Sequence, residues 1–337
     1  MTETILLTGG LGFIGSHISL SLLEAGYKVV IVDNLSNSRL EVLDCIDEIT
    51  FKKPIFHQGD IRDSSFIRDI FLKYKFDGVI HLAGLKSVVE SALDPLLYFD
   101  NNVVGTIRIL EAMKSFSVKK FIFSSSATVY GLPQYLPIKE DHPLSATNPY
   151  GRSKLIIESI LKDFFSSNVD WSIICLRYFN PIGAHPSGLI GENSLGKPSN
   201  LMPYINLVAS KELSNLNIYG DDYQTIDGTG VRDYIHIMDL VDGHIKALQY
   251  SFACKGFEAI NLGTGKGTSV LELVKAFEIA NGIIIPYKIQ PRRLGDVDEA
   301  YADPNYANKI LGFSCQKGLI EMCQDSWRYV LNKPLDN

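Results

Sequence analysis

The chain has 337 residues, of which 46% are hydrophobic and 21% are charged, and its formal net charge is −6. This composition is typical of a folded globular protein with a substantial core, and it excludes a disordered chain and a basic surface for nucleic acid. No apolar run approaches the length of about 20 residues that a transmembrane helix needs. The N-terminus lacks the basic and apolar leader of a secreted protein, so we expect a cytoplasmic protein.

The cysteines and histidines are not spaced like metal ligands. The five cysteines form no C-x-x-C pair, and they are Cys45, Cys175, Cys254, Cys315 and Cys323. Scattered thiols of this kind are expected to stay reduced, and Cys175 lies in an apolar run typical of a buried strand. The seven histidines contain no H-E-x-x-H motif. We therefore predict no metal site.

Short apolar runs alternate with helical patterns along the first half of the chain. Strands are expected at residues 4–8, 28–33, 54–58, 76–82, 119–125 and 172–179, and helices at about 14–26, 64–74, 96–117 and from near 150 onward. Strands that are apolar throughout and separated by helices are typical of an α/β fold with a doubly wound, Rossmann-like parallel sheet.

The composition changes after about residue 180. Residues 181–200 are rich in Gly, Pro, Ser and Asn and predict a long ordered loop, a kind of segment that is often functional. Shorter and less regular elements follow. We expect a dinucleotide-binding domain over residues 1–180 and a smaller α/β domain for the substrate over residues 181–337, with some C-terminal segments returning to the first domain.

The stretch T-G-G-L-G-F-I-G at residues 8–15 follows the first strand and opens the first helix. Its glycines satisfy both G-x-G-x-x-G and G-x-x-G-x-x-G, and they are Gly9, Gly10, Gly12 and Gly15. In this position they let the backbone approach a pyrophosphate, whose charge meets the helix N-terminus. Asp33 ends the second strand, where a carboxylate binds ribose hydroxyls and repels a 2′-phosphate. The pattern therefore predicts NAD, rather than NADP, as the cofactor.

Residues that follow the third and fourth strands reach the same edge of the sheet. Asp60-Ile61 and L-A-G-L-K at 82–86 lie there, which suits contacts to adenine and phosphate. Lys86 by itself is equally compatible with a solvated surface charge.

The stretch N-P-Y-G-R-S-K at residues 148–154 places Tyr150 and Lys154 four residues apart, behind a proline that favours the first turn of a helix. The two side chains then share one helix face, which by itself is also typical of an ordinary helix surface. The strand expected at 119–125 runs into S-S-S-A-T-V-Y, which brings hydroxyls to the sheet edge. Ser, Tyr and Lys beside a nicotinamide indicate a dehydrogenase that oxidises an alcohol. Because free Tyr has a pKa of about 10, Lys154 and the nicotinamide ring are expected to lower it.

Several longer stretches carry a resemblance to a known family. They are T-G-G-L-G-F-I-G-S-H, V-D-N-L-S-N-S, H-L-A-G-L-K-S-V, F-S-S-S-A-T-V-Y-G, P-Y-G-R-S-K, L-R-Y-F-N-P-I-G-A-H-P-S-G, N-L-M-P-Y, D-G-T-G-V-R-D-Y-I-H and P-R-R-L-G-D. They span nearly the whole chain in family order. On these residues the chain resembles the UDP-glucose 4-epimerases, which are extended short-chain dehydrogenases/reductases.

The resemblance implies roles for individual residues. Tyr150 is the general base and acid, Lys154 is its electrostatic partner and a ligand of the NAD ribose, and Ser126 bonds the sugar. The residues that match NAD contacts are Gly9, Gly12, Phe13, Ile14, Gly15, Asp33, Asn34, Asn37, Ser38, Asp60, Ile61, Leu82, Ala83, Gly84, Lys86, Asn101, Ser124, Tyr150, Lys154 and Phe179. Those that match the UDP-sugar site are Lys86, Ser126, Tyr150, Asn180, Asn200, Leu201, Asn217, Tyr219, Arg232, Arg293, Asp296 and Ala300.

By the same resemblance, the reaction is oxidation of a UDP-hexose at C4, rotation of the 4-keto intermediate, and return of the hydride to its other face. NAD then stays bound through turnover, because there is no net redox change. The family is commonly a homodimer, so a homodimer is implied here. Neither nucleic acid nor a membrane is an expected partner.

Ala300 matches a wall of the family's sugar pocket. Members restricted to UDP-glucose and UDP-galactose tend to carry tyrosine there, and a smaller residue leaves room for an N-acetyl group at C2. The resemblance therefore implies that UDP-GlcNAc and UDP-GalNAc are also substrates. The alternatives are that Ala300 points elsewhere or that Tyr301 closes the pocket.

Three other functions compete with an epimerase. A nucleotide-sugar 4,6-dehydratase carries an Asp-Glu pair directly after the hydroxyl residue that follows strand five, whereas this chain has Ala127 and Thr128 after Ser126. A nucleotide-sugar reductase commonly uses NADP, which Asp33 disfavours. A dinucleotide-binding sensor with a degenerate site would have no need of Ser126, Tyr150 and Lys154 together.

Overall fold

The computed structural model describes residues 2–193, 195, 198, 200–293 and 295–332. The chain forms two compact units, each built from separate stretches of sequence. Unit 1 takes the described residues of 1–131, 143–177 and 241–260, and unit 2 takes those of 132–142, 178–240 and 261–337. The chain leaves unit 1 for unit 2 after residue 177, near the domain boundary expected at residue 180. It returns to unit 1 for residues 241–260. The division into two domains itself stays a prediction.

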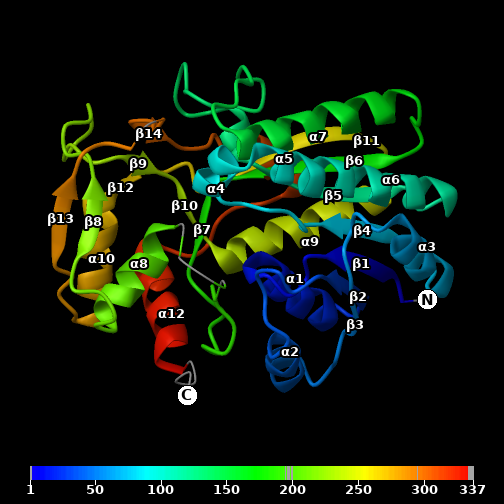
Figure 1. The fold of residues 1–337 in the computed structure, drawn as a ribbon, viewed down its shortest axis with the longest axis horizontal. Coiled ribbons are helices and arrows are strands. Elements are labelled where there is room, and N and C mark those ends of the chain that lie inside the picture. The colour runs from blue at the N-terminus through cyan, green and yellow to red at the C-terminus, as the bar shows by residue number, and fades with distance from the viewer. Residues whose placement is uncertain (1, 194, 196–197, 199, 294, 333–337) are drawn as a thin grey trace. The chain divides into compact units, whose positions relative to one another are not determined.

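Unit 1 is built on a seven-stranded sheet with the strand order β11-β6-β5-β4-β1-β2-β3. The strands are β1 (Thr4–Thr8), β2 (Lys28–Asp33), β3 (Ile55–Gln58), β4 (Gly78–His81), β5 (Lys120–Ser126), β6 (Ser172–Tyr178) and β11 (Gly256–Leu262). The pairs β1·β2, β1·β4, β2·β3 and β4·β5 are parallel. Figure 1 shows α1 and α9 on one face of this sheet and α6 and α7 on the other. The doubly wound α/β fold is confirmed.

The helices of unit 1 include those expected near residues 14–26, 64–74 and 150, and three further helices, at 42–50, 88–93 and 237–253, that were not expected. They are α1 (Phe13–Glu24), α2 (Val42–Thr50), α3 (Ser64–Lys73), α4 (Val88–Leu93), α5 (Pro95–Tyr98), α6 (Gly105–Ser115), α7 (Pro149–Ser166) and α9 (Ile237–Ala253), whose first turn lies in unit 2. The prediction of one continuous helix at 96–117 is wrong. A π-helical segment, η1 (Phe99–Val104), separates α5 from α6, and it contains the buried amide of Asn102. Such a π segment is often found at a functional site.

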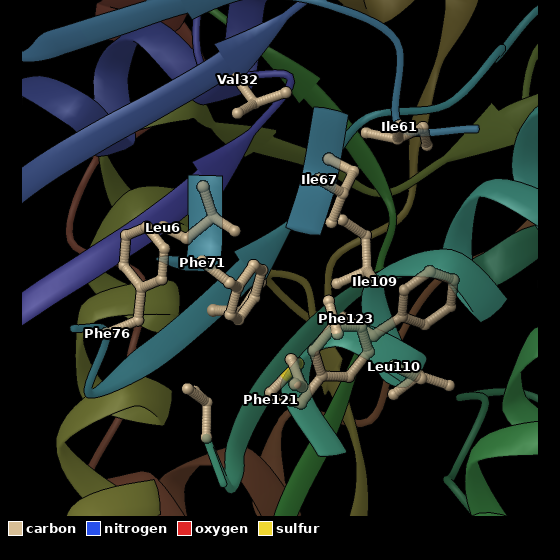
Figure 2. Close-up of a cluster of buried hydrophobic side chains, with 14 of the residues drawn as sticks. Leu6, Val32, Ile61, Ile67, Phe71, Phe76, Ile109, Leu110, Phe121 and Phe123 are labelled. Atoms are coloured by element: carbon tan, nitrogen blue, oxygen red, sulfur yellow. The ribbon is translucent and has the colours of Figure 1, made fainter. Parts of the chain in front are cut away.

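One hydrophobic core of unit 1 lies between the sheet and the helices α3, α6 and α7 (Figure 2). Phe121 and Phe123 are two residues apart in β5, so both side chains leave the same face of the strand. They pack in one cluster with Phe71 of α3 and Ile109 of α6. Each such side chain contributes about 1.5–3 kcal/mol when fully buried. Cys175 belongs to this cluster and is fully buried, as its apolar surroundings in the sequence predict.

Unit 2 contains small sheets and helices of its own. Its strands are β7 (Asn180–Ile182), β8 (Leu216–Tyr219), β9 (Val231–Arg232), β10 (Tyr234–His236), β12 (Thr268–Ser269), β13 (Tyr287–Gln290) and β14 (Glu299–Ala300). Its helices are α8 (Leu201–Ala209), α10 (Val270–Asn281), α11 (Asn305–Leu311) and α12 (Leu319–Asn332). Buried residues of α8, α10 and α12 form its core. The loop expected at 181–200 begins with β7 and contains an isolated bridge between Ala184 and Gly191, and part of it lies outside the described residues.

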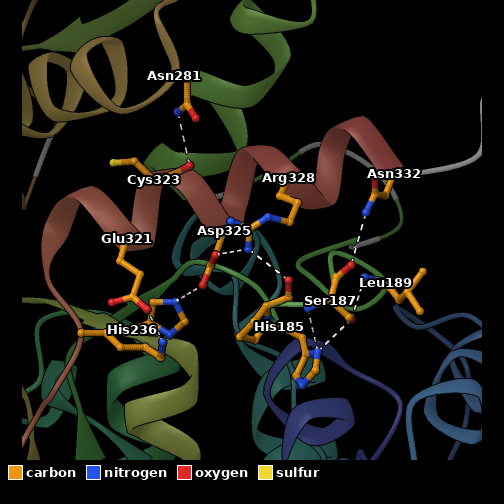
Figure 3. A network of polar contacts seen from close by, with 12 residues as sticks. His185, Ser187, Leu189, His236, Asn281, Glu321, Cys323, Asp325, Arg328 and Asn332 are labelled. Carbon is orange, nitrogen blue, oxygen red and sulfur yellow. Dashed lines mark hydrogen bonds and ion pairs between the residues drawn. The ribbon is translucent and has the colours of Figure 1, made fainter.

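A buried polar network ties α12 to the loop that follows β7 (Figure 3). His236 accepts the backbone N–H of Met238 at its Nδ1 atom, so its Nε2–H donates to Asp325 at 3.2 Å. Asp325 also pairs with Arg328, which donates to the carbonyl oxygen of Pro186 at 3.0 Å. His236 and Asp325 are 0% and 3% exposed, so breaking this pair would leave a buried group without its partner.

In the part of the chain that the structure describes, no helix is both long enough and apolar enough to cross a membrane.

Candidate active site

The glycine-rich loop makes a tight turn between β1 and α1. Gly9 has a φ of +70°, and a Cβ atom there would lie 2.7 Å from the backbone nitrogen of Ala83. A Cβ atom on Gly15 would lie 2.1 Å from the carbonyl oxygen of Gly9. Glycine is therefore required at both positions. Gly12 is the N-cap of α1 and provides no side-chain cap, so the first N–H groups of this helix are available to an anion.

Asp33 connects this loop to the loop that follows β2. Its carboxylate accepts hydrogen bonds from the backbone N–H of Leu11 at 3.1 Å, the backbone N–H of Leu35 at 2.9 Å and the hydroxyl of Ser38 at 2.8 Å. The side chain is 8% exposed. It therefore lies beside the glycine-rich loop, where the sequence predicts a ribose contact, and it also holds the two loops together.

The start of α7 agrees with the prediction from N-P-Y-G-R-S-K. Asn148 is the N-cap, and its side chain accepts the N–H of Gly151 at 2.8 Å, with Pro149 in the first turn. Tyr150 and Lys154 are 9% and 5% exposed. This burial excludes the alternative that the two residues belong to an ordinary solvated helix surface.

Tyr150 and Lys154 both contact the end of β5. Tyr150 hydrogen-bonds with the hydroxyl of Ser126, and the Lys154 ammonium donates to the carbonyl oxygen of Ser124 at 2.8 Å. The Nζ atom of Lys154 lies 4.8 Å from the ring centre of Phe123 and 6.0 Å from that of Tyr150. A hydroxyl, a phenol and an ammonium group are thus brought together within unit 1, as the sequence predicts.

The electrostatics of this cluster are set mainly by burial. Burial raises the pKa of Tyr150, an effect that the hydrogen bond from Ser126 opposes. Burial also lowers the pKa of Lys154 to about 8, while the charge of Glu158 raises it. Within the protein alone, burial therefore outweighs the hydrogen bond from Ser126 in setting the pKa of Tyr150. A lowering of the Tyr150 pKa by Lys154 and by the nicotinamide ring, the two sources named from the sequence, stays a prediction.

A buried amide that the sequence did not single out supports the same cluster. Asn102 of η1 donates to the carbonyl oxygen of Leu85 and to the hydroxyl of Ser153, both at 3.0 Å, and it accepts the N–H of Leu85 at 2.8 Å. Leu85 lies in the loop after β4, and Ser153 precedes Lys154 on α7. Asn102 therefore joins a loop expected to contact the cofactor to the helix that carries Tyr150.

His81, a buried histidine of β4, is neutral. Burial, reinforced by the charge of Lys154, lowers the pKa of His81 to about 3. Its two ring nitrogens hydrogen-bond with the hydroxyls of Thr8 at 2.7 Å and Thr106 at 3.0 Å. His81 therefore links β1, which leads into the glycine-rich loop, to α6 without adding a charge beside Lys154.

The groups present in unit 1 fit a dinucleotide. The buried hydroxyl of Ser124 has no hydrogen-bond partner among the described residues, and it adjoins the Tyr150–Lys154 cluster. Together with the open N-terminus of α1 and the carboxylate of Asp33, it provides partners for ribose and phosphate oxygens. The other residues expected to contact NAD differ in exposure: Asn34, Asn37, Gly84 and Lys86 are exposed, Phe13, Ile14, Leu82, Ala83 and Asn101 are partly buried, and Ile61 packs against Gly105 in the core.

Asp60 is already paired within unit 1. Its carboxylate accepts hydrogen bonds from the guanidinium of Arg62 at 2.7 and 3.0 Å, and Arg62 also bonds Asp100 at 2.6 Å. The Arg62 hydrogen bond is the main cause of a lowered pKa of Asp60. Asp60 therefore shapes the end of β3 in addition to the cofactor contact expected from the sequence.

The residues expected at the UDP-sugar site fall in unit 2, apart from Lys86, Ser126 and Tyr150. Arg293 lies over the ring of Tyr219, with 4.0 Å between the guanidinium carbon and the ring centre. Asn217 is exposed in β8 and accepts a hydrogen bond from Gln290 at 3.3 Å. Asn200 is the N-cap of α8, directly before Leu201, and Asn180 begins β7 after the buried Phe179.

Arg232, Asp296 and Ala300 lie together in unit 2. Arg232 donates to the carbonyl oxygens of Val231 at 2.8 Å and Val297 at 2.9 Å, and it forms an ion pair with Asp296 at 3.5 Å. In the parallel pairing of β9 with β14, Ala300 is the direct partner of Arg232. A guanidinium group and the small residue expected to line the sugar pocket are therefore side by side.

Among the described residues, no group of three or more His, Cys, Asp or Glu side chains is arranged to hold a metal ion.

Comparison with known proteins extends these observations over the whole chain. Residues 6–326 match the family model described as GDP-mannose 4,6 dehydratase. A UDP-glucose 4-epimerase of Bacillus subtilis is 52% identical over 325 residues, which are 96% of this chain and 96% of that protein. The chain belongs to the UDP-glucose 4-epimerase family. The family model bears the name of a dehydratase, but the chain has Ala127 and Thr128 where the dehydratases carry an acidic pair.

Solved structures of UDP-glucose 4-epimerases share the fold over nearly their full length. That of Stenotrophomonas maltophila, with bound NAD and formylated UDP-arabinopyranose, has a TM-score of 0.96 and 46% identity, covering 98% of both chains. That of Bifidobacterium longum, in complex with NAD+ and UDP, has a TM-score of 0.95 and 48% identity, covering 98% of this chain and 99% of the other. A UDP-Glc/GlcNAc 4-epimerase of Campylobacter jejuni is a more distant epimerase, with a TM-score of 0.85 and 32% identity, covering 98% of this chain and 100% of that one.

Proposed function

We propose that this chain is an NAD-dependent isomerase that interconverts UDP-glucose and UDP-galactose by inverting the configuration at C4. The observation that carries the proposal is the buried cluster of Ser126, Tyr150 and Lys154 at the end of β5, beside a glycine-rich loop suited to a dinucleotide. The relatives with 52% identity, which are named UDP-glucose 4-epimerases, support the same activity.

The roles of the chain's own residues follow from their placement. NAD, when bound, supplies the hydride acceptor and donor for the change at C4. The phenol oxygen of Tyr150 takes the proton from the C4 hydroxyl and later returns it, and Ser126 orients this oxygen. Lys154 provides positive charge and a donor for a ribose hydroxyl. Asp33 binds the adenosine ribose, and the N-terminus of α1 binds the pyrophosphate.

The proposal is tested by incubating the purified protein with UDP-glucose and no added cofactor. Formation of UDP-galactose without net production of NADH is the expected result. Loss of water from the sugar would indicate a dehydratase, a requirement for stoichiometric NADPH would indicate a reductase, and binding of NAD without turnover would indicate a sensor. Each of these three outcomes contradicts the proposal.

We further propose that the N-acetylated pair, UDP-GlcNAc and UDP-GalNAc, is also a substrate. Ala300 pairs directly with Arg232, and Tyr301 packs against Gly267, where a Cβ atom would lie 3.1 Å from its ring. Tyr301 follows the last residue of β14, and its ring lies against Gly267. This arrangement supports a small wall beside the sugar.

Substitution Ala300→Tyr tests this specificity. Turnover of UDP-GlcNAc should fall sharply while turnover of UDP-glucose is kept, because a phenol ring occupies the space of the acetamido group. Ala300→Ser is a matched control that adds little volume and should retain both activities. Wild-type protein that fails to convert UDP-GlcNAc would contradict the proposal.

We also propose a homodimer. Adjacent helices α4 and α5 expose large apolar side chains, with Leu93, Leu96 and Val89 at 82%, 77% and 66% exposure. An exposed apolar patch of this kind marks an interaction surface. Light scattering should give the mass of a dimer for the wild type and that of a monomer for Leu93→Glu/Leu96→Glu. A wild type with the mass of a monomer would exclude the proposal.

A further inference from the structure

A buried ion pair lies one helical turn beyond Lys154 on α7 and has no part in the function proposed above. Glu158 of α7 and Arg177 of β6 are both 4% exposed. The Arg177 guanidinium donates to the Glu158 carboxylate three times, at 3.0 and 3.2 Å from Nε and at 2.6 Å from an Nη atom. Its other Nη atom donates to the hydroxyl of Tyr130 at 3.0 Å. Two charges removed from water in this way are tolerated only when each is well paired.

The carboxylate of this pair reaches the strand on which the reacting groups rest. Ser125 is fully buried, and its hydroxyl donates to Glu158 at 2.5 Å. Ser125 stands between Ser124, whose carbonyl oxygen binds the Lys154 ammonium, and Ser126, whose hydroxyl binds Tyr150. Three consecutive residues of β5 are therefore joined to three positions of α7 that are one turn apart.

The spacing on α7 places Glu158 on the same face as the reacting groups. Residues 150, 154 and 158 are separated by four positions, which is about one helical turn. The negative charge of Glu158 thus lies one turn from the ammonium of Lys154, and it opposes the effect of burial, which favours neutral lysine. Arg177 approaches Glu158 from β6.

We propose that Glu158 is a positioning residue, which sets α7 against β5 through Ser125 and keeps Lys154 in its charged form. This inference rests on the proposed epimerase function. Without the hydrogen bond from Ser125, Tyr150 and Lys154 lose their alignment with Ser124 and Ser126. Without the carboxylate, the buried lysine loses its proton at a lower pH, and the proton transfer at Tyr150 loses a positive neighbour.

The titratable groups around Lys154 make this attribution testable. On its own helix they are Tyr150 and Glu158, and β4 contributes the neutral His81. The other elements packed against α7 contribute Glu90 of α4, which accepts a hydrogen bond from Tyr98, and Asp100 of η1, which is paired with Arg62. Glu158 is the acid that acts on the pKa of Lys154.

The first measurement follows the protonation of Lys154 without requiring turnover. The double variant Glu158→Gln/Arg177→Gln removes both charges together, so neither is left buried alone. NMR of protein with labelled lysine side chains, assigned by the signal lost in Lys154→Met, gives the pH at which Lys154 titrates. It should titrate at a lower pH in the double variant than in the wild type. Titration at the same pH in both would overturn the electrostatic part of the proposal.

The second measurement concerns catalysis. Ser125→Ala removes the hydrogen bond to Glu158 and leaves the ion pair in place. We expect kcat to fall about 2–10-fold, in keeping with the loss of one hydrogen bond, with KM and bound NAD unchanged and with Lys154 titrating as in the wild type. In the double variant kcat should fall further, and the alkaline limb of its pH profile should move to lower pH.

The outcomes separate the two proposals. Glu111→Gln, which breaks the exposed pair of Glu111 with Arg108, is the matched control and should leave kcat and the Lys154 titration unchanged. If the double variant does not fold, Ser125→Ala decides, and an unchanged kcat overturns the positioning role. A fall in kcat that accompanies loss of NAD, with no change in the Lys154 titration, also overturns it. A wild type without turnover counts against the epimerase function, and the NMR titration then still tests Glu158.

Discussion

The two units hold their candidate site residues in different ways. In unit 1, Ser126, Tyr150 and Lys154 are between 5% and 9% exposed, and each is bonded to another residue of the same unit. In unit 2, Arg293 and Asn217 are exposed, and the Asp296 side chain is 37% exposed in a weak ion pair with Arg232. The groups expected to transfer a proton are therefore buried and hydrogen-bonded, whereas Arg293, Asn217 and Asp296, which are expected to hold the nucleotide, are exposed to solvent.

The difference in exposure indicates that unit 1 is suited to proton transfer and unit 2 to binding of the nucleotide. Proton transfer needs atoms held in place and pKa values set by the surroundings, and burial provides both. Binding of a charged nucleotide instead needs accessible cations and hydrogen-bonding groups, which an exposed surface provides at lower desolvation cost. Substitutions in unit 1 are therefore expected to change kcat, and substitutions in unit 2 are expected to change KM.

Substitution of Tyr150 should give the largest effect. Tyr150→Phe keeps the ring and removes the proton carrier, so kcat should fall by about 10²–10⁴ or more, with bound NAD retained. Turnover of UDP-glucose and the NAD content of the purified variant check this. Tyr135→Phe, at a tyrosine that is 43% exposed, is the control and should behave as the wild type does. A Tyr150→Phe variant with half of the wild-type rate would show that another group is the base.

The expected effect in unit 2 is smaller and of a different kind. Arg293→Ala should raise KM for UDP-glucose about 10–100-fold, because a hydrogen bond to a charged group contributes about 1.5–3 kcal/mol. The value of kcat should change much less. Arg68→Ala, at an exposed arginine of α3, is the control. Steady-state kinetics over a wide range of substrate concentration distinguish the two constants. A lower kcat with an unchanged KM would contradict the expectation that substitutions in unit 2 change KM.

Asp33 tests the division between the units from another side, because it is a buried residue of unit 1 with an expected binding role. Asp33→Ser should lower the NAD content of the purified protein and reduce the discrimination against NADP, since the ribose acceptor and the repulsive charge are lost together. The ratio of NAD to NADP affinity is the decisive measurement, since the hydrogen bonds to Leu11 and Ser38 are also weakened. Asp44→Ser, at an exposed aspartate, is the control. An unchanged ratio would move the ribose contact to another residue.

The smallest expected effect is a dependence of stability on pH in unit 2. Burial raises the pKa of Asp325, but the His236 hydrogen bond and the Arg328 cation outweigh it, so the pKa lies below its usual value. A carboxylate with a lowered folded-state pKa stabilises the fold fully above the unfolded value of about 3.9, and this contribution is lost as the pH falls through the folded value. Asp325→Asn should therefore lower Tm at neutral pH, and its difference from the wild type should narrow below about pH 4. Asp44→Asn should show no such trend, and a difference that is constant with pH would contradict the assignment.

Much of unit 1 could be predicted because its signals are local. The apolar runs, the glycine-rich loop and the Tyr150–Lys154 spacing are properties of short stretches, and the strands and the start of α7 agree with them within a few residues. The same holds for Asp33, because the carboxyl end of a strand is recognisable from its own residues.

What could not be predicted depends on contacts between distant positions. Asn102 meets Ser153 across 51 residues, and Ser125 meets Glu158 across 33. The amide pair at 101–102 and the acid at 158 were visible as polar residues in apolar helical patterns, but their partners were not. The effect of burial on the pKa of Tyr150 could not be predicted either, because burial is a property of the packed fold and not of the spacing between two residues.

The way in which unit 1 is assembled affects how the gene can be divided. The edge strand β11 of its sheet follows β7, β8, β9 and β10 of unit 2 in the chain. It is therefore synthesised after them. On the ribosome, the edge of the cofactor-binding sheet is completed only after residues 178–240 of unit 2 have been synthesised. Neither unit corresponds to one continuous stretch of codons, so the nucleotide-binding half of this chain cannot be transferred to another protein as a single cassette.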